Sequence, residues 1–192
     1  MTGAAILEIE TRGRSDQTTE TWHRIAGGET GVLFAWCGRA VALLAGRDDA
    51  VLALDEFGRH LGVAFQMADD LRDVCDPALG KDRFSDIRSR TPSSVLVLAM
   101  QQTPGLRDRI VAAWGLPALT EEHVDQLGAE VAGSRGPALA REIVRRELDE
   151  ARRAARRATP QSGGDWAPDL GDSANSSCAE SRRKAPKRRQ PC

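Results

Sequence analysis

Apolar residues recur at helical spacing along most of the chain and predict an all-α fold. Several periodic segments begin with capping residues, as where Thr120 precedes Glu121 and Glu122. We expect helices at 3–12, 19–46, 49–75, 93–102, 105–115, 120–133 and 136–158. Gly27 and Gly28 predict a bend in the second helix. No alternation of apolar and polar residues indicates a β-strand.

The helix expected at 49–75 has two different faces. Its apolar face holds Leu54, Phe57, Leu61, Ala64, Ala68, Leu71 and Cys75. With a step of about 100° per residue, the opposite face holds Gln66, Asp69, Asp70 and Asp73. Carboxylates this close repel one another unless a cation neutralises them, and Mg²⁺ prefers oxygen ligands. A solvated acidic face is the alternative for an isolated DDxxD.

The segment 76–94 follows this helix and supplies the opposite charge. Pro77 and Gly80 predict a helix end and a loop. Four basic residues come next, namely Lys81, Arg83, Arg88 and Arg90. Lys81 is the only lysine before residue 184, and a compact ammonium suits a phosphate contact. Together with Asp86, these residues favour a site for a metal-bound phosphate or diphosphate over a solvated face.

The string GVAFQMADDLRD, followed by GKDRFSD, resembles the second aspartate-rich motif of the trans-isoprenyl diphosphate synthases, also called polyprenyl synthetases. The matching positions are Phe65, Gln66, Asp69, Asp70, Asp73, Gly80, Lys81 and Asp86. Residues 19–46 resemble the family helix that carries a lysine–threonine pair, here Glu29-Thr30. The likeness runs from about Gly3 to the mid-150s.

This resemblance implies a partial isoprenoid-synthase-type helical bundle with a central cavity. In that family two aspartate-rich motifs hold Mg²⁺ on the diphosphate of an allylic substrate, which isopentenyl diphosphate attacks head to tail. By resemblance, Asp69, Asp70 and Asp73 would bind Mg²⁺. Thr30, Gln66 and Lys81 would be catalytic, and they would bind substrate together with Asp86 and Arg90. The implied ligands are Mg²⁺, an allylic diphosphate and isopentenyl diphosphate.

The positive charge of the site departs from the family pattern. Glu29 places an anion where the family has a diphosphate-binding lysine. A second lysine, expected shortly after Asp86, is also absent, and Arg88 or Arg90 would have to substitute for it.

The first aspartate-rich motif has no counterpart in the sequence. Asp48 and Asp49 lack a third carboxylate at the required spacing and are typical of a helix start. We therefore interpret residues 1–158 as the C-terminal half of a prenyl synthase. Such a domain would work as a homo- or hetero-oligomer with a chain that carries the first motif. A non-catalytic partner subunit and a truncated remnant are the alternatives. A terpene cyclase is less favoured, because the GK–D string is typical of the diphosphate synthases.

Composition changes near Thr159. Residues 159–192 are rich in Gly, Ser, Pro and Asp and predict a disordered tail. The tail ends in a basic cluster, Arg182, Arg183, Lys184, Lys187, Arg188 and Arg189. A solvated tail is favoured over a membrane-surface or nucleic-acid site, so we expect no nucleic-acid partner. No apolar run approaches the roughly 20 residues of a membrane span. Without a signal peptide either, the sequence predicts a cytoplasmic location.

The remaining chemically distinctive residues receive structural interpretations. Cys37 and Cys75 show no metal-ligand spacing and are expected to pack as small hydrophobes. Trp22, Trp36 and Trp114 are expected in the core, and no histidine is given a catalytic role. Gly58 and Gly62, four residues apart, would allow a neighbouring helix to approach closely.

Overall fold

A computed structural model of the chain describes residues 2–76 and 83–159, and every regular element in that part is helical. The elements are α1 (Thr2–Thr11), α2 (Thr19–Ala26), η1 (Gly27–Gly31), α3 (Val32–Leu44), η2 (Asp48–Ala50), α4 (Val51–Cys75), α5 (Ser85–Arg88), α6 (Ser94–Gln102), α7 (Leu106–Trp114), α8 (Glu121–Gly133) and α9 (Gly136–Ala158). The all-α prediction is confirmed for the described residues. The expected disordered tail and the domain boundary before it fall on residues that lie almost wholly outside this part.

Two local features differ from the expected elements. The helix predicted at 19–46 is interrupted by η1, a π-helical segment that contains Gly27 and Gly28. The segment predicted as a loop after α4 contains the short helix α5. Neither the π-helical turn nor a four-residue helix leaves a periodic apolar pattern in the sequence.

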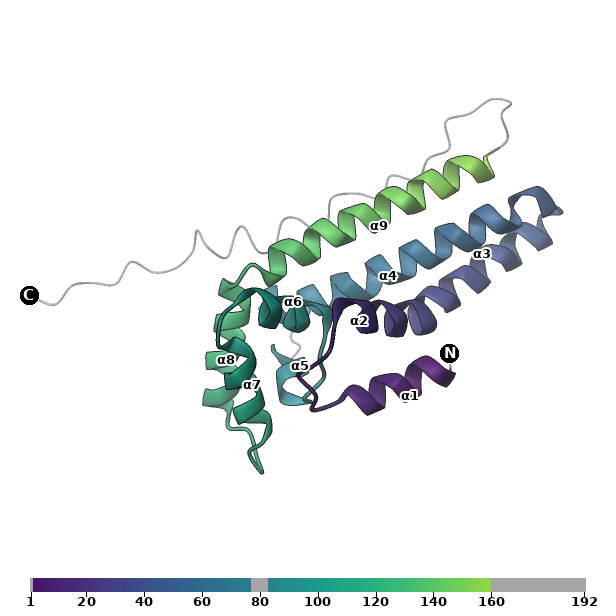
Figure 1. The fold of residues 1–192 in the computed structure, drawn as a ribbon. Coiled ribbons are helices and arrows are strands. Elements are labelled where there is room, and N and C mark those ends of the chain that lie inside the picture. The colour runs from purple at the N-terminus through teal and green to yellow at the C-terminus, as the bar shows by residue number, and fades with distance from the viewer. Residues whose placement is uncertain (1, 77–82, 160–192) are drawn as a thin grey trace, which may run out of the picture.

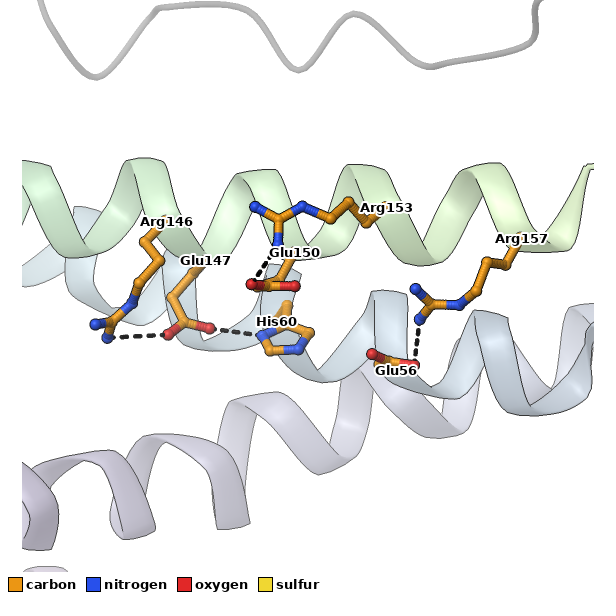
Figure 2. Close-up of polar contacts among 7 residues, drawn as sticks. All are labelled: Glu56, His60, Arg146, Glu147, Glu150, Arg153 and Arg157. Carbon is orange, nitrogen blue, oxygen red and sulfur yellow. Dashed lines mark hydrogen bonds and ion pairs between the residues drawn. The ribbon is translucent and has the colours of Figure 1, made fainter.

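Helix α4 is the central element, lying between α3 and α9 (Figure 1). Helix α9 packs small side chains against it, and Ala140, Ala151 and Ala154 are fully buried. Alanine brings two helix backbones close together, and its burial costs no side-chain entropy. The same contact also has a polar edge. His60 of α4 meets Glu147 of α9, with 2.7 Å between His60 Nδ1 and Glu147 Oε2 (Figure 2).

Glycines set the separation between α3 and α4. A Cβ atom on Gly58 would lie 2.3 Å from the carbonyl oxygen of Phe34, and one on Gly62 would lie 2.7 Å from Gly31 Cα. On the facing helix, a Cβ on Gly38 would lie 2.2 Å from the carbonyl oxygen of Leu54. These distances are too short for any side chain, so the prediction of close approach at Gly58 and Gly62 is confirmed.

The main hydrophobic core lies at the end of α4 where α6 and α8 meet it, with α7 packed against those two helices. It buries branched and long apolar side chains completely, among them Met67, Val95, Leu96, Leu106, Ile110, Val124 and Val131. Trp114 joins this core and donates a hydrogen bond from Nε1 to the carbonyl oxygen of Ile87 at 3.1 Å. This core therefore anchors α5.

Two residues of α3 are exposed although the sequence predicted that they would be buried. Trp36 is 60% exposed, and Cys37 is also exposed. Trp22, Trp114 and Cys75 are buried as predicted. The sequence pattern correctly identified an apolar helix, but among the described residues only one side of α3 is covered.

Candidate active site

The carboxylate of Asp70 is buried, with 7% of the residue exposed. Its Oδ2 accepts hydrogen bonds from Trp22 Nε1 at 3.1 Å and from the backbone N–H of Ser94 at 2.8 Å. Its Oδ1 accepts a longer one, 3.4 Å, from Gln66 Nε2. Burial raises the pKa of Asp70, and the hydrogen bonds from Ser94 and Gln66 oppose that rise. Asp70 therefore joins α2, α4 and α6 in the folded chain.

Asp73 organises the segment that follows α4. Its Oδ1 accepts hydrogen bonds from the Ser85 backbone N–H at 3.0 Å and from Ser85 Oγ at 2.6 Å. Its Oδ2 accepts a longer one, 3.3 Å, from the backbone N–H of Asp86. The side chain thus satisfies the free N–H groups at the first turn of α5. A solvated acidic face is the wrong interpretation for Asp70 and Asp73, because the tertiary structure surrounds both with donors.

Asp69 lies between these two residues and has a different environment. It accepts no hydrogen bond from another described residue, and it lines a cavity of about 130 Å³. Among the described residues, six carboxylate side chains line that cavity: Glu8, Glu29, Asp69, Asp70, Asp73 and Asp86. No arginine or lysine among the described residues lines it. Asp69 is consequently the aspartate of the motif whose oxygens are available to a ligand.

Thr30 and Gln66 come together although 36 residues separate them in the chain. Thr30 Oγ1 donates a hydrogen bond to Gln66 Oε1 at 2.9 Å, and Gln66 Nε2 points to Asp70. Gln66 also lines the cavity. The two residues therefore form a hydrogen-bonded relay from η1 to the buried carboxylate, and this relay fixes the orientation of the Gln66 amide.

Glu29 adds negative charge to the same cavity. Partial burial raises the pKa of Glu29, and the nearby carboxylate of Glu8 raises it further. Glu29 comes directly before Thr30 and occupies the position of the lysine in the family's lysine–threonine pair. The cavity therefore has a carboxylate where the family motif has a lysine.

The two arginines considered for substrate binding, Arg88 and Arg90, have other partners in the structure. Arg90 donates a hydrogen bond from Nη2 to the carbonyl oxygen of Leu116 at 2.7 Å. Arg88 pairs with Glu121 at 2.7 Å. Neither guanidinium lines the cavity. Lys81 and Gly80 lie outside the described residues.

The donor set fits a divalent cation that is shared with a phosphate ligand. Within residues 2–76 and 83–159, no three His, Cys, Asp or Glu side chains gather closely enough to hold a metal by themselves. Mg²⁺, however, is usually held by one or two carboxylates plus substrate phosphates and water. Asp69 offers such a carboxylate.

Sequence reasoning missed several polar residues of the site. Trp22 was expected only as a core residue, yet its N–H binds Asp70. Ser85 and Ser94 hold the other carboxylates, and Ser93 lines the cavity with an Oγ that has no partner among the described residues. The sequence offers no signal for these roles, because each depends on contacts between separate helices.

An all-helical fold with an aspartate-rich helix over a carboxylate cavity defines an isoprenoid-synthase-type protein. A solved polyprenyl synthetase from Streptomyces coelicolor has this fold, with a TM-score of 0.73 at 28% identity over 80% of the present chain and 48% of its own. A polyprenyl synthase from Caulobacter crescentus, solved with calcium and isoprenyl diphosphate, gives a TM-score of 0.74 at 26% identity over 81% of this chain and 48% of its own.

The chain belongs to the polyprenyl synthetase family, whose sequence model matches residues 2–131. It is 32% identical to the geranylgeranyl diphosphate synthase of Mycobacterium tuberculosis over 152 residues. That match covers 77% of this chain and 42% of the synthase. The chain thus spans less than half of that relative and about half of the solved relatives. None of the helices in the described part has a stretch apolar and long enough to cross a bilayer.

Proposed function

We propose that this chain forms one part of a prenyltransferase site for the Mg²⁺-dependent condensation of isopentenyl diphosphate with an allylic diphosphate. The observation that carries the proposal is Asp69, whose oxygens accept no hydrogen bond from the described residues, in a cavity that six described carboxylates line. The bound calcium and isoprenyl diphosphate in the Caulobacter crescentus relative support this pairing of cation and ligand.

The roles of the individual side chains follow from their environments. Asp69 would contact the cation, and the cation would stabilise negative charge on the departing diphosphate. Asp70 and Asp73 would position it, since protein N–H and hydroxyl groups already occupy their oxygens. Gln66, oriented by Thr30, would present its amide to the reacting end of the allylic substrate. Lys81 and Asp86 remain proposed diphosphate contacts, whereas Arg90 would have to leave Leu116 to reach the ligand.

A cation is also required by electrostatics. A diphosphate that approaches a cavity with six carboxylates and no described basic residue is repelled. Divalent ions between the carboxylates and the phosphates turn this repulsion into attraction. The acidic lining therefore predicts that diphosphate binding depends strongly on the divalent cation.

A second candidate function is a non-catalytic partner subunit of a synthase. Glu29 favours it, because an anion that lines the cavity would repel a diphosphate. Both functions place the chain in an assembly with a polypeptide that carries the first aspartate-rich motif, and we propose a cytoplasmic setting for either. A prenyl-transfer assay with that polypeptide, using Asp69→Asn in this chain, separates them: only the catalytic role requires Asp69.

The direct test is calorimetric titration of the 192-residue chain with inorganic pyrophosphate, with and without Mg²⁺. We expect binding only with Mg²⁺ and its loss in Asp69→Asn, which keeps the size of the side chain and removes its charge. Asp125→Asn is the matched control, because Asp125 is exposed on α8, away from the cavity. Unchanged Mg²⁺-dependent binding by Asp69→Asn would overturn the site assignment.

A further inference from the structure

The outward side of α3 is a continuous apolar surface. The residues Leu33, Trp36, Val41 and Leu44 are 46%, 60%, 60% and 89% exposed, and we call them the α3 outer face. The inward side of α3 carries Ala35 and Ala42, which are buried against α4. The only charged residue in α3, Arg39, pairs with Asp55 of α4.

A helix that is apolar all round is normally covered on both sides. Soluble proteins rarely leave a large contiguous apolar patch in water unless it is an interaction site. Trp36 is informative here, because a tryptophan indole offers more buried area than any other side chain and is enriched in interface cores. All four residues of the α3 outer face are apolar, as is typical of a protein interior.

This face begins close in sequence to residues of the candidate active site. Phe65 of α4 is 58% exposed and packs against Phe34 of α3, with 5.7 Å between the ring centroids. Phe65 directly precedes Gln66, and Leu33 follows one turn after Glu29 and Thr30. The α3 outer face therefore begins about one helical turn from Glu29, which lines the acidic cavity.

The solved relatives show how much of the fold lies outside the chain. This chain covers 48% of the Streptomyces coelicolor and Caulobacter crescentus chains, with TM-scores of 0.73 and 0.74. About half of each of those chains is thus additional polypeptide beyond the part they share with this chain. An apolar helix face on the shared half is where such helices would pack.

We propose that the α3 outer face, with Phe65, is the docking surface for the part of a polyprenyl synthetase fold that these 192 residues do not span. The occupant is a helical segment that presents an apolar face to α3. This inference rests on the proposed function only for the identity of the occupant, because the exposed face itself is independent of catalysis.

Two other occupants fit the face less well. The segment 160–192 is mostly polar and ends in six basic residues, whereas the α3 outer face holds no acidic side chain to attract them. A second copy of this chain would cover the apolar face but would bring a second acidic cavity beside the first, at a cost in like-charge repulsion.

The experiment is site-specific photo-crosslinking. The photoreactive residue p-benzoyl-phenylalanine replaces Leu44 through the native gene, and the crosslinked product is identified by mass spectrometry. We expect a crosslink to a polyprenyl synthetase segment absent from these 192 residues, and the size of the product shows whether it is joined to them or separate. Val111, 48% exposed on α7, is the matched control position and should give no such crosslink.

A crosslink to a second copy, to residues 160–192, or to no polyprenyl synthetase segment overturns the proposal. The double variant Trp36→Asp/Val41→Asp, which keeps the photoreactive residue at position 44, should lose the captured segment without a change in thermal unfolding, because both side chains are exposed. Asp69→Asn should leave capture intact. Capture without Mg²⁺-dependent pyrophosphate binding would reject the proposed function and support the docking surface. Mg²⁺-dependent pyrophosphate binding without capture would support the proposed function and reject the docking surface.

Discussion

The indole N–H of Trp22 donates a hydrogen bond to Asp70 Oδ2 across 48 residues of sequence, at 3.1 Å. Ser94 donates its backbone N–H to the same oxygen. The Asp70 carboxylate thereby links α2, α4 and α6. We therefore expect its removal to lower the stability of the fold, whether or not a ligand is bound.

Asp70→Ala should destabilise the chain by about 2–4 kcal/mol, because it leaves the buried N–H groups of Trp22 and Ser94 without an acceptor. The free energy of unfolding from urea denaturation measures this. Asp69→Ala is the matched comparison on the same helix, and it should cost less than about 1 kcal/mol because Asp69 accepts no hydrogen bond from the described residues. Equal losses would show that Asp70 does not hold the helices together.

The raised pKa of Asp70 predicts a pH dependence of stability. The folded carboxyl keeps its proton to higher pH than the unfolded one, whose pKa is near 3.8. Folding therefore takes up a proton in this window, and stability falls as pH rises from about 3.8 through the raised folded pKa. Asp70→Asn should remove this decline. Urea midpoints measured across that pH range would show it, and a decline that persists in the variant would contradict the cause.

Glu29→Lys should strengthen Mg²⁺-dependent pyrophosphate binding by about tenfold, which corresponds to about 1.4 kcal/mol. The substitution reverses the charge of a group that lines the acidic cavity and faces Glu8. Glu29→Gln is the matched control and should give a smaller gain, since it removes the negative charge without adding a positive one. Calorimetric titration measures both. Weaker binding by the lysine variant would mean that Glu29 contributes to holding the cation.

Gly58→Ala should destabilise the chain by about 1–3 kcal/mol. Its Cβ would lie 2.3 Å from the backbone oxygen of Phe34, so α3 and α4 would have to separate. Gly133→Ala at the end of α8 is the control, because a Cβ there meets nothing within 4 Å. Thermal unfolding should show a lower midpoint for the first variant and an unchanged or higher one for the second.

A double-mutant cycle on His60 and Glu147 should give a coupling energy of about 1–2 kcal/mol. Glu147 is 9% exposed and joins α9 to the partly exposed His60 of α4 (Figure 2), so the carboxylate of the pair is shielded from water. The exposed pair Glu56 and Arg157, which joins the same helices, should give at most about 0.5 kcal/mol because water and salt screen it. Similar coupling in both cycles would contradict the role of burial.

The sequence by itself determined the helices and the family. Apolar periodicity located each of the long helices within a few residues, because a helix buries a stripe with its own 3.6-residue period. The string from Gln66 to Asp86 pointed to the polyprenyl synthetases, since the spacing of carboxylates along a helix is a local property. Gly58 and Gly62 likewise indicated the close α3–α4 contact.

Only the tertiary structure decided how the residues of the motif differ. The sequence treats Asp69, Asp70 and Asp73 as equivalent, whereas donors from α2, α5 and α6 occupy the oxygens of the last two. Donors that arrive from elsewhere in the chain leave no local pattern. For the same reason the sequence placed Trp36 in a core, because apolar periodicity predicts that a face is covered but not by which polypeptide.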